Sequence, residues 1–291
     1  DTVRKAILWS AYAILAGQII VGGTQFFGVR VFDVIYTSAK SSPYDQLLRL
    51  SGTLANPNFF GWLMLQTVTI VGLLNKRKSA YPIIIIGAAM SVASGSRTAT
   101  LIVPFVLILV LSFRSSPRVR IFRLLGLALL VGVVSVPLFL AVADHLPYVK
   151  SIRQIFITGS LTEISSLNAR FLHWEMVAER FQQGDIWVWL LGLSDRPYTQ
   201  NVDSDYLYVL FRNGVIGLTL HLSFVSYLLK LCYRFRQSEI AQICVVYVLS
   251  ALAMGAVAET LAGWLIPTWL FYLIGITIGE DRRTSHVPPG S

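Results

Sequence analysis

Eight long apolar stretches recur along the chain, and they limit its fold more than any other feature of the sequence. They are Ala6–Gly22, Phe59–Leu74, Tyr81–Ala93, Thr98–Phe113, Leu124–Ala143, Tyr206–Leu229, Ala241–Ala258 and Leu261–Ile278. Only 13% of the 291 residues are charged, about half the share of a soluble domain. Apolar segments of this length are typical of membrane-spanning helices. The sequence therefore predicts an all-α, polytopic integral membrane helical bundle with about eight transmembrane helices.

The stretch from Tyr81 to Phe113 is long enough to form either one helix or two. One helix of this length would extend about 50 Å, which exceeds a hydrocarbon core of about 30 Å. We therefore expect a turn at Ser94–Arg97, and by the same reasoning a second turn at Glu259–Thr260.

The basic residues favour a topology with a hairpin at each of these turns. Fourteen of the 24 basic residues then fall, with four acids, in short segments on one side of the membrane. The positive-inside rule assigns that side, and both termini, to the cytoplasm. A single helix over Tyr81–Phe113 would place the basic cluster Arg114–Arg123 outside, against the rule. Because the positive charge follows this membrane pattern, the net charge of +9 predicts membrane lipid, and not nucleic acid, as the partner.

This topology divides the chain into four parts. Residues 1–143 contain the first five membrane helices, residues 144–205 form one large extracytoplasmic loop, residues 206–280 contain the last three helices, and residues 281–291 form a cytoplasmic tail. The first apolar stretch follows Arg4 and Lys5 directly, so we interpret it as a membrane span and not as a signal peptide. The outer side then carries the loop Thr24–Pro57, the turn at Arg97 and the large loop.

The large loop Asp144–Asp205 is polar, mixed in charge and rich in aromatic residues. Solvated linkers rarely carry so many aromatic residues, so we expect a folded loop that acts on a polar substrate. Within it, Ser165–Gln183 is expected to form an amphipathic helix, capped by Ser165 or Ser166 and ended by Gly184. Its apolar face consists of Phe171, Trp174, Val177, Ala178 and Phe181. The apolar stretch Trp187–Leu191 is expected to pack either on the membrane surface or on the helices.

Two arginines on the outer side are candidate binding residues. Arg97 lies between two apolar stretches, where an ionisable residue is costly unless it has a partner or a polar cavity. Its planar fork of donors suits a diphosphate, although an arginine that snorkels at a turn is the alternative. Arg170 lies in the large loop with His173 one helical turn further on. It could complete a phosphate clamp or pair only with an acid such as Glu175.

Two predicted helix starts on the outer side carry further candidates. Asn56 can cap a helix that begins at Pro57, with Asn58 in its first turn. The positive end of that helix would point toward an anionic ligand or be an ordinary cap. Asp203 and Asp205 open a later span, where carboxylates can serve as caps or as a general base. Arg212 is costly alone within that span, and one or both of these acids could be its partners.

Cys232 and Cys244 lie at or near the cytoplasmic side in this topology, so neither a disulfide nor a metal site is expected. The sequence contains no metal-ligand spacing, phosphate-binding loop or dinucleotide fingerprint. Catalysis by a Ser-His-Asp triad has no supporting motif.

Several motifs occur in an order that resembles the O-antigen ligase/O-antigen polymerase superfamily of bacterial integral-membrane glycosyltransferases. They are Gly52-x-x-x-Asn56-Pro57-Asn58, Ser94-Gly95-Ser96-Arg97-Thr98-Ala99, Asn168-Ala169-Arg170 with Trp174, Asp203-Ser204-Asp205-Tyr206-Leu207 and Gly214-Val215-Ile216-Gly217-Leu218. The resemblance covers Gly52 to Leu218. Each motif alone is weak, and the resemblance rests on their order, spacing and common sidedness.

The resemblance implies transfer of a glycan from a polyprenyl-diphosphate carrier to a glycan acceptor at the outer face of the bacterial cytoplasmic membrane. Such enzymes use no metal, cofactor or nucleotide sugar. Arg97 matches the arginine of the family's Ser-Arg-small motif, and Arg170 matches the arginine of its large loop. Both are implied to hold the donor diphosphate. The family usually has more spans before the first one found here, so the chain resembles an N-terminally incomplete or shortened member.

One departure from the family pattern bears on the type of transferase. Asp203 stands where ligases of this family place a histidine tied to catalysis. We therefore expect a polymerase that joins repeat units of a surface polysaccharide such as O-antigen, capsule or exopolysaccharide, with Asp203 as general base and His173 in reserve. A flippase and a chain-length regulator would be its functional partners.

Two alternatives stay open. The first is a ligase that transfers finished glycan to lipid or protein. The second is a transporter or channel for an anion or a lipid-linked sugar, which intramembrane arginines would also serve. A transporter should show inverted repeats and helices broken at mid-membrane, and the sequence indicates neither. The sugar and its linkage are not encoded in any motif.

Overall fold

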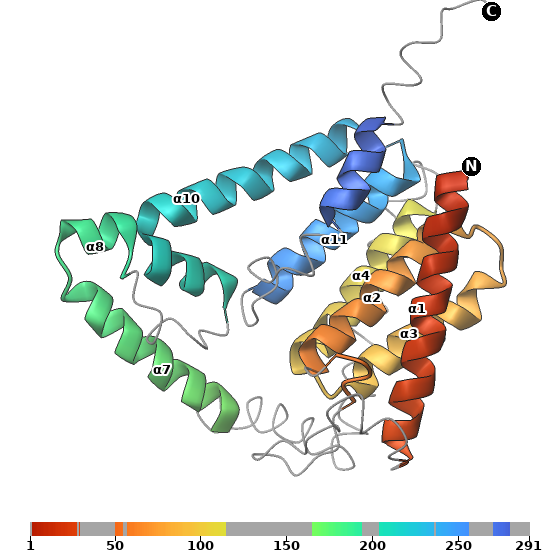
Figure 1. Ribbon diagram of the computed structural model, residues 1–291, viewed down its shortest axis with the longest axis horizontal. Helices are drawn as coiled ribbons and strands as arrows, with labels where there is room; N and C mark the ends of the chain where they lie inside the picture. The colour runs from red at the N-terminus through yellow and green to blue at the C-terminus, as the bar shows by residue number, and fades with distance from the viewer. Residues whose placement is uncertain are drawn as a thin grey trace, which may run out of the picture. The chain divides into compact units, whose positions relative to one another are not determined.

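The computed structural model describes residues 2–27, 29, 50–54, 57–114, 165–193, 204–235, 237–255 and 270–279. Every regular element within these residues is a helix (Figure 1), which confirms the all-α fold class. The chain divides into two compact units, Asp1–Ser165 and Ser166–Ser291. Seven of the eight predicted apolar stretches fall wholly or partly in these helices, and the eighth, Leu124–Ala143, lies outside the described residues.

Three helices are long and apolar enough to cross a membrane, namely Thr2–Gln25, Pro57–Leu74 and Asp205–Arg234. Shorter apolar helices cover Ala80–Ala93, Thr98–Phe113, Glu239–Gly255 and Leu270–Gly279. These helices indicate a membrane protein. The count of eight spans and the orientation of the chain remain predictions.

The first unit is a bundle of α1 (Thr2–Phe26), α2 (Pro57–Leu74), α3 (Ala80–Ala93) and α4 (Arg97–Phe113). Helix α2 is its centre, packs against the other three helices and is largely buried. Glycines allow this close packing, since a methyl group at Gly61 would lie 2.7 Å from the Ala99 side chain. Small residues play this role between membrane helices.

The expected turn between two short helices is present at Ser94–Ser96. The chain leaves α3 at Ser94, passes through Gly95 at φ +64° and enters α4 at Arg97. Glycine adopts this left-handed conformation without steric cost. The structure therefore has two helices where the sequence predicted two.

One end of the first unit gathers the basic segments that the sequence assigned to the cytoplasm. Arg114 donates to the backbone carbonyls of Gly72, Asn75, Lys76 and Arg77, at 2.6 to 3.4 Å. Arg4 donates to the Leu74 carbonyl at 2.8 Å. The carbonyls of Gly72 and Leu74 belong to the negative end of α2, which favours a cation, and the other three follow it in the chain. Arg4 and Arg114 therefore lie at one end of the first unit, and the assignment of that end to the cytoplasm stays a prediction.

The second unit consists of α7 (Ser165–Gln182, whose first residue lies at the boundary), α8 (Ile186–Leu191), α10 (Asp205–Arg234), α11 (Glu239–Gly255) and the helix Leu270–Gly279. The amphipathic helix predicted within the large loop is α7. Val177 and Phe181 on its apolar face are buried against Phe211 of α10, with Trp174 and Ala178 beside them. The predicted face of α7 therefore packs on α10.

The predicted single span over Tyr206–Leu229 is wrong in one respect, because α10 is broken. Gly214 has φ +66° and ψ −169°, which divides α10 into a first segment, residues 205–213, and a second segment, residues 215–234. The two segments run in different directions in Figure 1. This φ/ψ region is open essentially to glycine alone, so Gly214 fixes the position of the break.

Candidate functional site

The N-terminal end of α4 places the first candidate residue. The Ser96 hydroxyl accepts a hydrogen bond from the Ala99 amide at 3.2 Å and so caps the helix. Arg97 is the first helical residue, although its side chain lies outside the described part of the structure. The helix dipole concentrates partial positive charge at such an end. The backbone at the start of α4 therefore carries partial positive charge, of the same sign as the Arg97 guanidinium.

The N-terminal end of α2 lies beside that of α4 within the first unit. Ser91 donates from its hydroxyl to the Gly61 carbonyl at 2.9 Å, and a methyl group at Gly61 would touch Ala99. Helix α2 begins at Pro57, as predicted, and Asn58 falls in its first turn. Asn56 lies outside the described residues. Two helix N-termini thus share one end of the bundle, opposite the end that holds Arg4 and Arg114.

Two buried glutamines of α1 hold the segment that leads into α2. The Gln25 amide oxygen accepts from the amides of Ser51 and Gly52, at 3.2 and 2.9 Å, and its nitrogen donates to the Gly52 carbonyl at 3.1 Å. Gln18 makes the same kind of double contact with Thr53. Sequence reasoning missed both glutamines, whose signal was a polar pair seven residues apart in an apolar helix.

The second unit carries the other arginine of the predicted clamp. Arg170 lies on α7, but its side chain is outside the described part. His173, one turn further on, has a buried Nε2 atom without a hydrogen-bond partner among the described residues, and so has Trp174 at Nε1. Arg97 and Arg170 belong to different units. Their convergence on one diphosphate therefore stays a prediction.

The start of α10 corrects the expected cap. Ser204 is the capping residue, since its hydroxyl accepts from the Leu207 amide at 3.5 Å. Asp205 is the first residue of the helix and is 1% exposed. A methyl group added at Gly255 of α11 would lie 3.0 Å from the Asp205 carboxylate. Asp203, the predicted base, lies outside the described residues and immediately precedes this cap.

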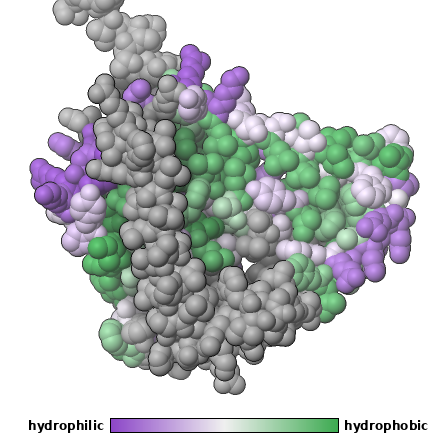
Figure 2. Space-filling model, turned by 180° about the vertical axis from the view of Figure 1, so that it is seen from behind, coloured by the Kyte–Doolittle hydropathy of each residue, from purple (hydrophilic) through white to green (hydrophobic). Residues whose placement is uncertain are grey.

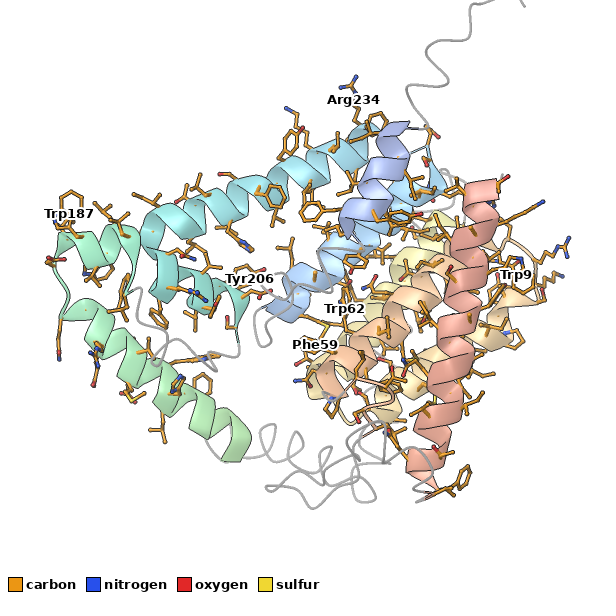
Figure 3. The ribbon with its side chains drawn as sticks, viewed as in Figure 1. Trp9, Phe59, Trp62, Trp187, Tyr206 and Arg234 are labelled. Atoms are coloured by element: carbon orange, nitrogen blue, oxygen red, sulfur yellow. The ribbon has the colours of Figure 1, made fainter. Side chains whose placement is uncertain are left out.

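Helix α11 holds the same end of α10 through two further contacts. The Ser204 hydroxyl donates to the Gly255 carbonyl at 3.2 Å, and the Tyr206 hydroxyl donates to the Leu252 carbonyl at 2.7 Å. Figure 3 shows Tyr206 at the end of α10 that faces α11. Ser204 and Tyr206, at the start of α10, are therefore both held by backbone carbonyls of α11.

Arg212 has a partner that the sequence did not indicate. Its guanidinium donates to the Tyr208 hydroxyl, one helical turn earlier, and its central carbon lies 5.3 Å from the centre of the Tyr208 ring. Asp203 lies outside the described residues, so the pairing of Arg212 with an acid at the helix start stays a prediction beside this local contact.

The break in α10 is part of a backbone junction with α8. The Leu193 amide donates to the Phe211 carbonyl at 2.7 Å. A methyl group at Gly214 would overlap the Leu190 carbonyl, and one at Gly192 would overlap the Arg212 carbonyl. Gly192 and Gly214 therefore allow the backbone at the end of α8 to contact the backbone of α10 directly. The signal in the sequence was Gly192 and Gly214 themselves, each next to an apolar stretch.

Cys232 and Cys244 are both buried free thiols. No group of three or more His, Cys, Asp or Glu side chains gathers in the described part of the chain. Comparison with known proteins adds no relative, since no family model, curated protein or solved structure matches this chain.

Proposed function

We propose that this chain is a membrane glycosyltransferase that polymerises polyprenyl-diphosphate-linked oligosaccharide repeat units into a bacterial surface polysaccharide. The reaction would take place at the outer face of the cytoplasmic membrane. The observation that carries the proposal is the pair of helix N-termini, α2 at Pro57 and α4 at Arg97, on one end of the first unit. Helix N-termini with an arginine favour phosphate groups.

In the proposed reaction, an acceptor hydroxyl attacks the anomeric carbon of the donor glycan. The new bond joins that carbon to the acceptor oxygen while the bond from the carbon to the diphosphate oxygen breaks. Arg97 and Arg170 bind the diphosphate and stabilise the charge that develops as it leaves. Asp203 takes the proton from the hydroxyl, and His173 is the reserve candidate for this role.

The contacts around α10 support the roles given to the two acids. Ser204 and Tyr206 are both held by carbonyls of α11, so a base at Asp203 would be attached to a fixed backbone. Asp205 is buried at the helix start, where its charge is favourable to the dipole. We therefore assign proton transfer to Asp203 and a structural role to Asp205.

The diphosphate clamp is tested with Arg97→Ala, Arg97→Lys and Arg170→Ala in the purified protein. Polymer formed from lipid-linked repeat units should fall by a factor of about 100 or more in either alanine variant. Arg97→Lys should recover only part of the rate, because a point charge cannot make the bidentate contact. Arg180→Ala, at an exposed arginine of α7, is the control. Parental rates in both alanine variants would refute the clamp.

The base is tested in the same assay with three variants. Asp203→Asn should lower the rate about 100-fold or more while donor binding persists. Asp205→Asn should chiefly reduce the yield of folded protein. If His173→Ala is inactive while Asp203→Asn works normally, His173 is the base. Activity in all three variants would leave positioning and leaving-group stabilisation as the source of catalysis.

One observation favours the transporter as a second candidate. Transporters commonly bind substrate where membrane helices are broken near the bilayer midplane, and a transporter would require the break of α10 at Gly214 to lie at that depth. The two candidates differ in a measurable product. The polymerase lengthens lipid-linked repeat units in detergent solution, whereas a transporter moves its substrate only across sealed vesicles and leaves its covalent structure unchanged.

A further inference from the structure

We propose that α8 lies in the headgroup boundary of the lipid bilayer and anchors the helix pair α7–α8 to the membrane surface. The surface involved, called the α8 face below, consists of Ile186, Trp187 and Leu191. These side chains are 64%, 63% and 57% exposed. The proposal does not depend on the glycan chemistry proposed above.

The α8 face is exposed although α8 itself is capped and packed on one side against the second unit. Asp185 caps α8 by accepting from the Val188 amide at 3.0 Å. Val188 packs on the cluster that Val177, Phe181 and Phe211 form, and the Trp189 ring lies 4.8 Å from the Phe181 ring. One side of α8 is therefore fixed on the second unit. Trp187 projects from α8 away from α10 (Figure 3).

The break in α10 sets the depth of α8 relative to the membrane. The second segment of α10 runs from residue 215 to Arg234, about 30 Å at the rise of an α-helix. This length matches the hydrocarbon core. Lys230 and Arg234 mark the cytoplasmic end of the segment by the positive-inside rule. Gly214, where α8 touches α10, then lies at the opposite boundary of the core.

The α8 face continues into the exposed face of the second segment of α10. Leu190 and Leu191 abut Gly214, and the next residues, Val215 and Ile216, are apolar and exposed. Apolar side chains cover much of the surface around α10 in Figure 2. Because a membrane-spanning segment presents such a face to lipid, the adjoining α8 face meets the same lipid. Tryptophan is enriched at this depth.

The charged residues of α7 and α8 indicate whether the charge of the lipid headgroup contributes to binding. Residues 165–193, which contain α7 and α8, carry three acids, Glu175, Glu179 and Asp185, and two bases, Arg170 and Arg180. Anionic headgroups attract basic segments. Because this segment has more acids than bases, anionic lipid should not strengthen its binding to the membrane. The anchor therefore acts by burial of apolar side chains, about 5–10 Å into the headgroup and acyl boundary, and works in zwitterionic lipid.

The test uses the full chain labelled with 5-fluorotryptophan in nanodiscs of phosphatidylcholine, observed by fluorine NMR. Trp187→Phe assigns the Trp187 signal, and Trp62→Phe assigns the signal of buried Trp62. Nitroxide lipids labelled at acyl carbon 5 or carbon 16, and a water-soluble gadolinium chelate, are added in turn. We expect the carbon-5 label to relax Trp187 at least roughly tenfold more than the carbon-16 label, given a leaflet about 15 Å deep. Adding anionic lipid should leave this ratio unchanged.

Other occupants of the α8 face give different results. Relaxation of Trp187 by the chelate alone would place the face in water and overturn the proposal. Protection from both lipid labels and the chelate, as expected for Trp62, would show that a second copy or another protein covers it. Dependence on anionic lipid would refute the assignment to apolar burial. Each result is obtained on the parental fold, because Trp187→Phe serves only to assign a signal.

Discussion

The junction between α8 and α10 predicts a large effect from a single methyl group. In Gly214→Ala, the new methyl group would overlap the Leu190 carbonyl and lie 2.6 Å from the Leu191 amide nitrogen. Alanine would also have to adopt φ +66° and ψ −169°. This backbone region costs an L-residue about 1–3 kcal/mol, and overpacking adds about 1–3 kcal/mol. The free energy of unfolding should therefore fall by about 2–6 kcal/mol.

The assay is denaturation by SDS of the purified protein in mixed micelles, followed by tryptophan fluorescence and circular dichroism. Gly275→Ala is the matched control, because Gly275 lies in a helix of the same unit and, among the described residues, no atom outside its own stretch of helix lies within 4 Å of an added methyl group. There alanine should stabilise the helix by up to about 1 kcal/mol. Gly192→Ala disturbs the same junction through the Arg212 carbonyl, so its effect should not add to that of Gly214→Ala.

Two results would contradict this account. Equal stability of Gly214→Ala and Gly275→Ala would mean that α10 is a continuous helix in which position 214 is ordinary. Full additivity of Gly192→Ala and Gly214→Ala would mean that the two glycines do not share one junction. Either result would also remove the depth argument for α8.

Three further predictions concern the first unit, and each is measured by the same denaturation. Gln25→Leu leaves three backbone groups of Ser51 and Gly52 without partners and should cost about 3 kcal/mol or more, whereas Gln182→Leu, at an exposed site, should change little. Arg114→Met removes the guanidinium from four carbonyls and should cost about 2–3 kcal/mol; full rescue by lysine would contradict the need for a fork of donors. Ser96→Ala should cost about 1 kcal/mol and Ser96→Gly only a few tenths, so the reverse order would argue against the cap.

Two predicted features agree with the structure because the spacing of apolar residues was their signal. The turn at Ser94–Ser96 was predictable because a continuous helix would exceed the thickness of the bilayer. The apolar face of α7 was predictable because Trp174, Val177 and Phe181 recur at the period of a helix. Both arguments need only the number of residues between positions of one segment, converted to a helix length or to a helix face.

The candidate site was predictable only in part. The start of α2 at Pro57 followed from local helix signals, and the turn that precedes α4 followed from the length of the apolar stretch. The cap at Ser204 and the contact of Arg212 with Tyr208 did not, because neighbouring polar residues offered several partners of similar energy. The side chains of Arg97 and Arg170, and the whole of Asp203, lie outside the described residues, so their roles stay predictions.

The sequence by itself determined that the described part of the chain is helical and apolar, and that α3 and α4 are separate helices, since these features depend on the residues within one segment. The tertiary structure alone decided that α10 breaks at Gly214 and that α1 holds the start of α2 through Gln18 and Gln25. A glycine or a glutamine in an apolar stretch has several acceptable local environments. The partner that selects one of them, the Leu190 carbonyl or the Gly52 backbone, comes from a distant segment and becomes known only when the segments pack.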